Sequence, residues 1–232
     1  MNRSYEKELM DLPGAPAELL EEDLKNLRTL NRYLGAHRAV LWGLEYSIKR
    51  SGIKSFSLLD IGTGSGDLPA AIVSWAGRNG LSATVVGLEP NPTTVEVARR
   101  RTRHITEISI ICGDGFNPPF RPRAFDVVLT SQVLHHFSEK EILALLQIWA
   151  GLARQGVLIG DLIRHPLAYH GVRLLTRLFT RNEMTLIDAP LSVRRSFTIS
   201  EWKNLFNRTG IGHFQVFRFF PFRLFALLSV EQ

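Results

Sequence analysis

One short run, LLDIGTGSGD at residues 58–67, constrains the fold more than any other part of the chain. Its apolar start is typical of a buried strand, and the pattern that follows, from Leu68 to Arg78, is helical. Glycines between a strand and a helix allow a sharp turn and let a ligand approach the backbone closely. The run therefore predicts a ligand site at the carboxyl end of the first strand of an α/β sheet.

Strand-like and helix-like segments alternate after this run. The capping box Ser138-x-x-Glu141 marks the start of one helix. Such alternation predicts an α/β fold with a doubly wound, Rossmann-like, mostly parallel sheet. We expect strands at 56–61, 83–88, 108–112, 125–129 and 157–161, with helices at 68–78, 93–102 and 138–153.

Additional segments surround this core. Leucines at helical spacing make the first fifty residues read as helices, one of them over 37–49, and an extra helix is expected at 165–179, followed by a mixed stretch. The tail reads as two strands that turn at Pro221. We divide the chain into a helical cap (1–52), a cofactor-binding core (53–163), a lid or substrate insert (164–197), and a helix with a strand pair that completes the core (198–232).

The composition argues against several classes of protein: disulfide-rich, zinc-binding, secreted and nucleic-acid-binding ones. The chain of 232 residues has one cysteine, so it has no disulfide framework and no cysteine cluster for structural zinc, and we expect no metal site. The beginning of the chain lacks the apolar run of a signal peptide, which fits a cytoplasmic protein without stable membrane insertion. The net charge of +6 comes from scattered arginines, so we interpret it as a solvated surface and expect no nucleic-acid partner.

Two nucleotide cofactors compete for the glycine loop. A dinucleotide fingerprint needs a third glycine where this chain has Asp67, and Asp60 and Asp67 would both repel a pyrophosphate. A cationic sulfonium cofactor gains from the same carboxylates. Glu89 can accept both ribose hydroxyls of either cofactor, while Asp114 is placed to accept from an adenine amine and Phe116 to pack on its ring.

These motifs resemble those of the class I S-adenosylmethionine-dependent methyltransferases, in their small-molecule branch, which includes natural-product and ubiquinone- or menaquinone-type enzymes. DIGTGSG resembles the first motif, LEPN the second-strand acid, CGDG the third motif and AFDVVLTSQVLHHF the fourth-strand segment. The resemblance covers about residues 56–160 and implies S-adenosylmethionine as the cofactor. It implies that the cofactor-binding residues are Asp60, Gly62, Gly64, Gly66, Glu89, Pro90, Asp114, Gly115, Phe116, Ser131 and Gln132.

Two regions offer a general base for an acceptor that must lose a proton. His135 and His136 follow the fourth strand, and His165 and Tyr169 belong to the insert after the fifth. Histidine suits proton abstraction near neutral pH. The apolar insert favours a small hydrophobic acceptor. The insert also resembles one of bacterial natural-product methyltransferases, and the family resemblance implies a phenolic hydroxyl or an activated ring carbon of a polyketide, quinone or lipid-like compound.

The stretch Asn117-Pro118-Pro119-Phe120 spells a motif of methyltransferases that act on nitrogen. In those enzymes it follows the fourth strand, whereas here it precedes that strand. We therefore interpret it as a loop stiffened by proline, and favour an oxygen or carbon nucleophile.

Other functions stay open at this point. The basic charge suggests an RNA or protein methyltransferase as the alternative, and an NAD-type oxidoreductase or a non-catalytic regulator that binds the cofactor are two more. A homodimer is one oligomeric state that the sequence leaves open.

Overall fold

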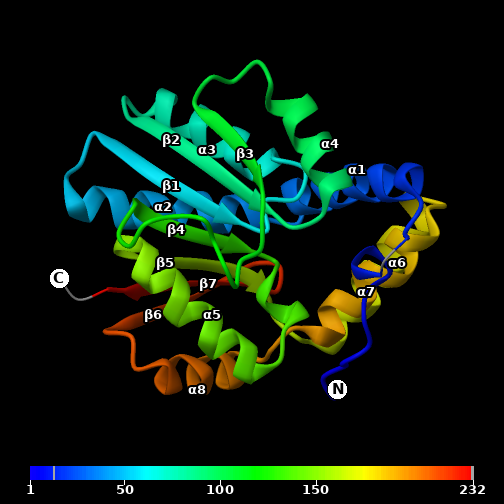
Figure 1. The fold of residues 1–232 in the computed structure, drawn as a ribbon. Helices are drawn as coiled ribbons and strands as arrows, with labels where there is room; N and C mark the ends of the chain where they lie inside the picture. Colours follow the sequence, from blue (N-terminus) through cyan, green and yellow to red (C-terminus); the bar gives the residue numbers. More distant parts are fainter. Residues whose placement is uncertain (13, 231–232) are drawn as a thin grey trace.

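A seven-stranded sheet runs through the computed structural model, which describes residues 1–12 and 14–230 (Figure 1). The sheet has the order β3-β2-β1-β4-β5-β7-β6, in which β1 to β5 are parallel and β7 is antiparallel to both β5 and β6. This is the expected doubly wound sheet. Its strands are β1 (Ser55–Ile61), β2 (Ser82–Glu89), β3 (Ile108–Cys112), β4 (Phe125–Ser131), β5 (Ala153–Leu162), β6 (Phe214–Phe219) and β7 (Arg223–Ser229).

Helices cover both faces of the sheet because successive strand residues point to opposite sides. On one face, Leu58 of β1 packs with residues of α2 (Ala36–Ser51) and α3 (Asp67–Arg78). On the other, its neighbour Leu59 packs with residues of α5 (Glu139–Leu152) and α8 (Ile199–Thr209). α4 (Pro92–Thr102) packs beside β3. The expected capping box of α5 is formed, and Thr198 and Glu201 form a second one at the start of α8.

Three helices gather beyond one end of the sheet, where Figure 1 shows α1 (Ala17–Tyr33), α6 (Pro166–Phe179) and α7 (Glu183–Arg195) together. The mixed stretch expected after α6 consists largely of a further helix, α7, which forms despite Pro190 inside it. Asn182 caps this helix by accepting from the backbone N–H of Thr185 at 3.0 Å. Burial of Met184 against Leu20 and Leu24 of α1 adds the tertiary support that outweighs the proline.

The beginning of the chain also differs from its expected helical form. Apart from a short 3-10 turn at Leu9–Asp11, residues 1–12 are not helical. The Asp188 carboxylate of α7 accepts from the N–H groups of Leu9 and Met10 at 2.8 and 3.0 Å, and Ser4 N–H donates to the Arg194 carbonyl. These bonds hold the segment against α7. From α1 onward, the two predicted N-terminal helices are present.

The tail forms the two strands predicted around Pro221, and β7 enters the sheet beside β5. Among the described residues, no helix is both long and apolar enough to cross a membrane.

Helix α2 lies so close to β7 that its contact residue must be glycine. A Cβ at Gly43 would lie 2.0 Å from a ring atom of Phe225, whereas one at Gly77 of α3 would meet nothing within 4 Å. We predict that Gly43→Ala lowers the free energy of unfolding by about 1–3 kcal/mol because the core becomes overpacked. The matched change Gly77→Ala should raise it by up to about 1 kcal/mol through helix propensity. Urea unfolding of both variants measures the difference, and equal effects would contradict this packing.

Candidate active site

Two cavities meet where the parallel strands end. The first has a volume of about 270 Å³ and lies over the glycine loop between β1 and α3. The second, of about 310 Å³, lies between α1, α6, α7 and the start of β7. Asn31 and Gln132 line both cavities, so the two spaces are neighbours. Ligands of doubly wound sheets bind at this edge.

The glycine loop makes the floor of the first cavity. Gly62 has φ +72°, and a Cβ there would lie 2.3 Å from the Val133 side chain, so only glycine fits. Gly64 has φ +55° and donates its N–H to the Glu89 carboxylate at 3.0 Å. The loop thus ties the end of β1 to the end of β2 and presents a backbone without side chains to the cavity.

Buried carboxylates surround this loop. Burial raises the pKa of Asp60 to about 7, although Thr63 donates a hydrogen bond to it at 2.7 Å. Burial also raises the pKa of Glu89, against the hydrogen bonds from the N–H groups of Asn91 and Gly64. Each carboxylate oxygen of Glu89 accepts one backbone bond and keeps lone pairs for a ligand's hydroxyls. An acidic surround of this kind suits a cationic ligand.

Asp67 begins α3 and discriminates between the two nucleotide cofactors. Burial opposes its ionisation, but hydrogen bonds from His37 at 2.7 Å and from Ser65 at 2.9 Å outweigh burial and lower its pKa. A dinucleotide places its pyrophosphate at this helix N-terminus, where the ionised Asp67 would repel it. The first cavity therefore disfavours NAD and favours a sulfonium compound.

The third-motif residues line the far end of the same cavity. Asp114 accepts from the N–H of Phe116 at 2.9 Å, and Trp149 of α5 donates to the Gly115 carbonyl at 2.9 Å. These bonds orient Phe116 beside the cavity. The Asn117–Phe120 stretch lies before β4, as predicted, and Phe120 packs edge-on against Phe125 at 5.0 Å between ring centroids.

Gln132, directly after β4, has a strained backbone. Its φ of +58° is in the left-handed region, which costs a non-glycine residue about 1–3 kcal/mol. Its N–H donates to the Gly160 carbonyl at 2.7 Å, its amide donates to Asn31 at 2.6 Å, and it accepts from Arg223 at 2.7 Å. Strain held by three hydrogen bonds at the boundary of two cavities indicates a positioning role.

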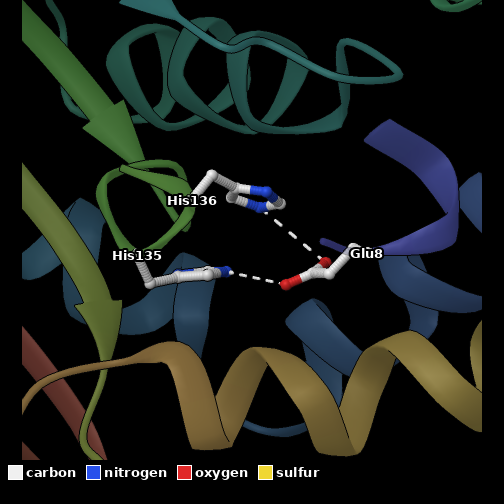
Figure 2. Close-up of side chains that lie close together, drawn as sticks. All are labelled: Glu8, His135 and His136. Atoms are coloured by element: carbon white, nitrogen blue, oxygen red, sulfur yellow. Dashed lines mark ion pairs between the residues drawn. The ribbon is translucent and has the colours of Figure 1, made fainter. Parts of the chain in front are cut away.

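The two histidines after β4 form a cluster with Glu8 of the N-terminal segment. Figure 2 shows both rings directed toward the Glu8 carboxylate. His135 Nε2 lies 3.7 Å from Glu8 Oε1, and His136 Nε2 lies 3.8 Å from Oε2. The other ring nitrogens are held by carboxylates, His135 Nδ1 by Asp161 and His136 Nδ1 by Asp11, both at 2.7 Å. The rings stack with centroids 4.5 Å apart.

This cluster lines the first cavity and is largely buried. Glu8 is 1% exposed, and burial raises its pKa to about 7, although His136 and a 2.9 Å hydrogen bond from Ser192 oppose that rise. Arg195 is the cation in contact, with Nε 3.8 Å from the carboxylate. Two imidazoles and a carboxylate can take a proton from a ligand or bind a cation.

His165 and Tyr169 occupy a different place. His165 caps α6, with Nδ1 accepting from the N–H of Leu167 at 3.2 Å, and its ring stacks on Phe222 at 4.8 Å. Tyr169 packs edge-on against His170. Neither residue lines either cavity. Of the two candidate regions for a general base, the geometry thus favours His135 and His136 after β4 over His165 and Tyr169.

The second cavity is apolar. Its walls include Leu27 and Leu30 of α1, Val172 and Leu175 of α6, and Val193 of α7. Its polar lining is Asn31, Gln132, Ser192 and Arg223. Burial lowers the pKa of Arg223 to about 10, an effect that nearby Asp161 opposes.

Sequence reasoning missed Glu8, Asp161 and Arg223. Asp161 lies at the end of a predicted strand, and this position indicates a residue at the ligand-binding edge of the sheet. Glu8 lies 127 residues before His135 in a segment without a motif, and Arg223 lies in the tail, so no local pattern marks either one. All eleven predicted cofactor residues except Gly66 line the first cavity.

Comparisons with known proteins agree with this geometry. Residues 59–160 match the family model described as a methyltransferase domain. A segment of 70 residues is 33% identical to the demethylmenaquinone methyltransferase of Staphylococcus haemolyticus (strain JCSC1435). This segment is 30% of this chain and 28% of the length of that enzyme.

Solved structures share the fold. Human N-acetylserotonin methyltransferase in complex with SAM (S-adenosylmethionine) has 20% identity and a TM-score of 0.66, over 99% of this chain and 64% of that one. The plantazolicin methyltransferase BpumL, in complex with a triazolic desmethylPZN analog and SAH (the demethylated cofactor), has 17% identity and a TM-score of 0.66, over 92% and 90%. Residues 59–160 of this chain thus match a methyltransferase domain, and the chain shares its fold with solved methyltransferases that bind SAM or SAH.

Proposed function

We propose that this protein transfers the methyl group of S-adenosylmethionine to an oxygen or activated ring carbon of a small apolar acceptor. The observation that carries the proposal is the junction of the two cavities, one acidic and built on the glycine loop, the other apolar and built by α1, α6 and α7. A cationic cofactor and an apolar acceptor are thereby held next to each other.

Each part of the cofactor is matched by residues of suitable chemistry in the first cavity. The Glu89 carboxylate takes the ribose hydroxyls, and Asp114 with Phe116 takes the adenine. The acidic loop around Asp60 faces the ammonium and sulfonium charges. Arg28 of α1 lines the same cavity and supplies a cation for the methionine carboxylate.

Methyl transfer is an in-line displacement. The acceptor's nucleophilic atom forms a bond to the methyl carbon, the carbon–sulfur bond breaks, and its electron pair stays on sulfur. An acceptor hydroxyl must also lose its proton. The cluster of Glu8, His135 and His136 borders the cavity and is suited to activate that hydroxyl.

The shape of the acceptor space supports a small molecule over a polymer. The second cavity is bordered by three helices and is mostly apolar, as is common for small-molecule sites. Phenolic polyketide, quinone or lipid-like compounds fit this description. No observation on this surface specifically favours RNA or a protein as the acceptor.

We predict that Glu89→Gln weakens S-adenosylmethionine binding by about 10-fold or more, because hydrogen bonds to a carboxylate contribute about 1.5–3 kcal/mol each. Isothermal titration calorimetry measures the affinity. The control Glu96→Gln changes an exposed residue of α4 and should bind normally. NAD should give no binding heat with any variant. Tight NAD binding, or full affinity in Glu89→Gln, would contradict the assignment.

We predict that His135→Ala and His136→Ala each reduce turnover about 100-fold or more, as expected when acceptor activation is lost. His165→Ala and Tyr169→Phe should keep most of the activity, because both residues lie outside the two cavities. Transfer from methyl-labelled cofactor to a panel of apolar phenols gives the rates. If His165→Ala were inactive while both cluster variants kept full rate, the activating group would lie on the insert instead.

We predict that Val172→Trp, which fills the second cavity, lowers kcat/KM for the phenol panel about 10-fold or more and leaves cofactor affinity unchanged. Leu174→Trp is the matched control, since Leu174 is 62% exposed on the same helix and lines neither cavity. Equal losses in both variants would show that the acceptor lies elsewhere.

A further inference from the structure

The Glu8, His135 and His136 cluster has the arrangement of a metal site. We propose that these three side chains bind one divalent transition-metal cation, with Zn²⁺ as the best match to the ligands. Their nearest ligand atoms all lie within 4.8 Å of one another. Two histidines and one glutamate form a ligand set used by catalytic zinc, in which further coordination positions stay open to water or substrate.

The histidine rings are oriented for metal binding. Nδ1 of His135 is held by Asp161, and Nδ1 of His136 is held by Asp11. A carboxylate partner favours the proton on Nδ1, so each Nε2 keeps a bare lone pair. Carboxylates that fix metal-binding histidines in this way are a general feature of such sites. Both bare lone pairs face the Glu8 carboxylate (Figure 2).

The spacing leaves a place for a cation. At 3.7 and 3.8 Å, the two Nε2–oxygen separations are too long for hydrogen bonds. Ligands bound at about 2.0–2.2 Å around a tetrahedral zinc lie about 3.3–3.6 Å apart. Side-chain adjustment would bring the three ligand atoms, which lie within 4.8 Å of one another, to this spacing. Without a cation, the two lone pairs would face Glu8 when it is ionised, which is unfavourable.

The charges around Glu8 also favour a bound cation. Arg195 donates Nε to the His135 carbonyl, Nη1 to the Glu6 carbonyl and Nη2 to the His136 carbonyl, so its nitrogens are committed to backbone. Glu8 therefore lacks a hydrogen-bonded cationic partner among the described residues. Asp11 and Asp161 are held by the histidines, and Asp161 also lies near Arg223, whereas Glu8 faces Arg195 at 3.8 Å without a hydrogen bond from it. Buried charges normally have a counter-ion.

The ion would deepen the proposed function, on which this role rests. The cluster lines the cofactor cavity, and Ser192, which donates to Glu8, also lines the acceptor cavity. An acceptor hydroxyl bound to the ion would lose its proton to water at a lowered pKa. The oxygen's electron pair would then form the bond to the methyl carbon, while the carbon–sulfur pair passes to sulfur and neutralises the sulfonium.

The test is direct metal binding to the untagged chain of 232 residues. After removal of metals with a chelator, the protein is titrated with Zn²⁺, and bound metal is measured by elemental analysis. Co²⁺ absorption reports the coordination geometry. We expect about one Zn²⁺ per chain. Glu8→Gln, which preserves shape, should weaken binding about 100-fold or more, and Asp161→Asn about 10-fold or more through loss of ring orientation.

His104→Ala is the matched control, because His104 is exposed and is not among the residues that line the first cavity. Its affinity should equal that of the unchanged chain. Failure of the unchanged chain to retain stoichiometric metal, or equal weakening in His104→Ala, would overturn the proposal and leave the cluster with proton transfer alone. Calorimetry with S-adenosylmethionine on the metal-free chain is a separate readout. Stoichiometric zinc without methyl transfer would support the site and count against the proposed function.

Discussion

Parallel pairing of β1, β4 and β5 is the constraint on which the site depends. Ile61 pairs with Thr130, and Ser131 pairs with Gly160, so the three strands end at one level of the sheet. The residues that follow each strand are therefore brought together without long loops. In this way the glycine loop after β1, the histidines after β4 and Asp161 at the end of β5 come to share one edge.

A second constraint is the docking of residues 1–12 against α7. The segment has little regular structure of its own, and its backbone groups are satisfied by Asp188 and by the Arg194 carbonyl. It places Glu8 beside His135 and His136 and thereby completes a polar cluster that the core alone lacks. Because α7 also lines the acceptor cavity through Val193, one helix connects the cluster with the apolar space.

Buried carboxylates give the site its electrostatic character. Asp60, Glu89 and Glu8 are each less than a tenth exposed, and burial raises the pKa of all three. Burying an ionised carboxylate costs free energy, and a bound cationic ligand offsets that cost. In the proposed function the sulfonium and ammonium of the cofactor would balance the charge of Asp60, and the proposed divalent cation would balance that of Glu8.

The local patterns of the sequence determined the α/β core and most of the residues that line the first cavity. The run around Gly62 and the pair Asp114 and Phe116 follow strands, and Glu89 ends one. The place of a residue at the carboxyl end of a parallel strand is set by chain direction alone. These assignments needed only short-range pattern and the rules of parallel sheets.

Tertiary structure alone decided which side chains complete the site. α7 forms although Pro190 interrupts its pattern, because burial against α1 outweighs helix propensity. Glu8 and Arg223 reach the cavities from opposite ends of the chain, and their contacts with His135 and Gln132 depend on packing between segments more than ninety residues apart. Local sequence carries no signal for such contacts, since they arise from the burial of whole elements against one another.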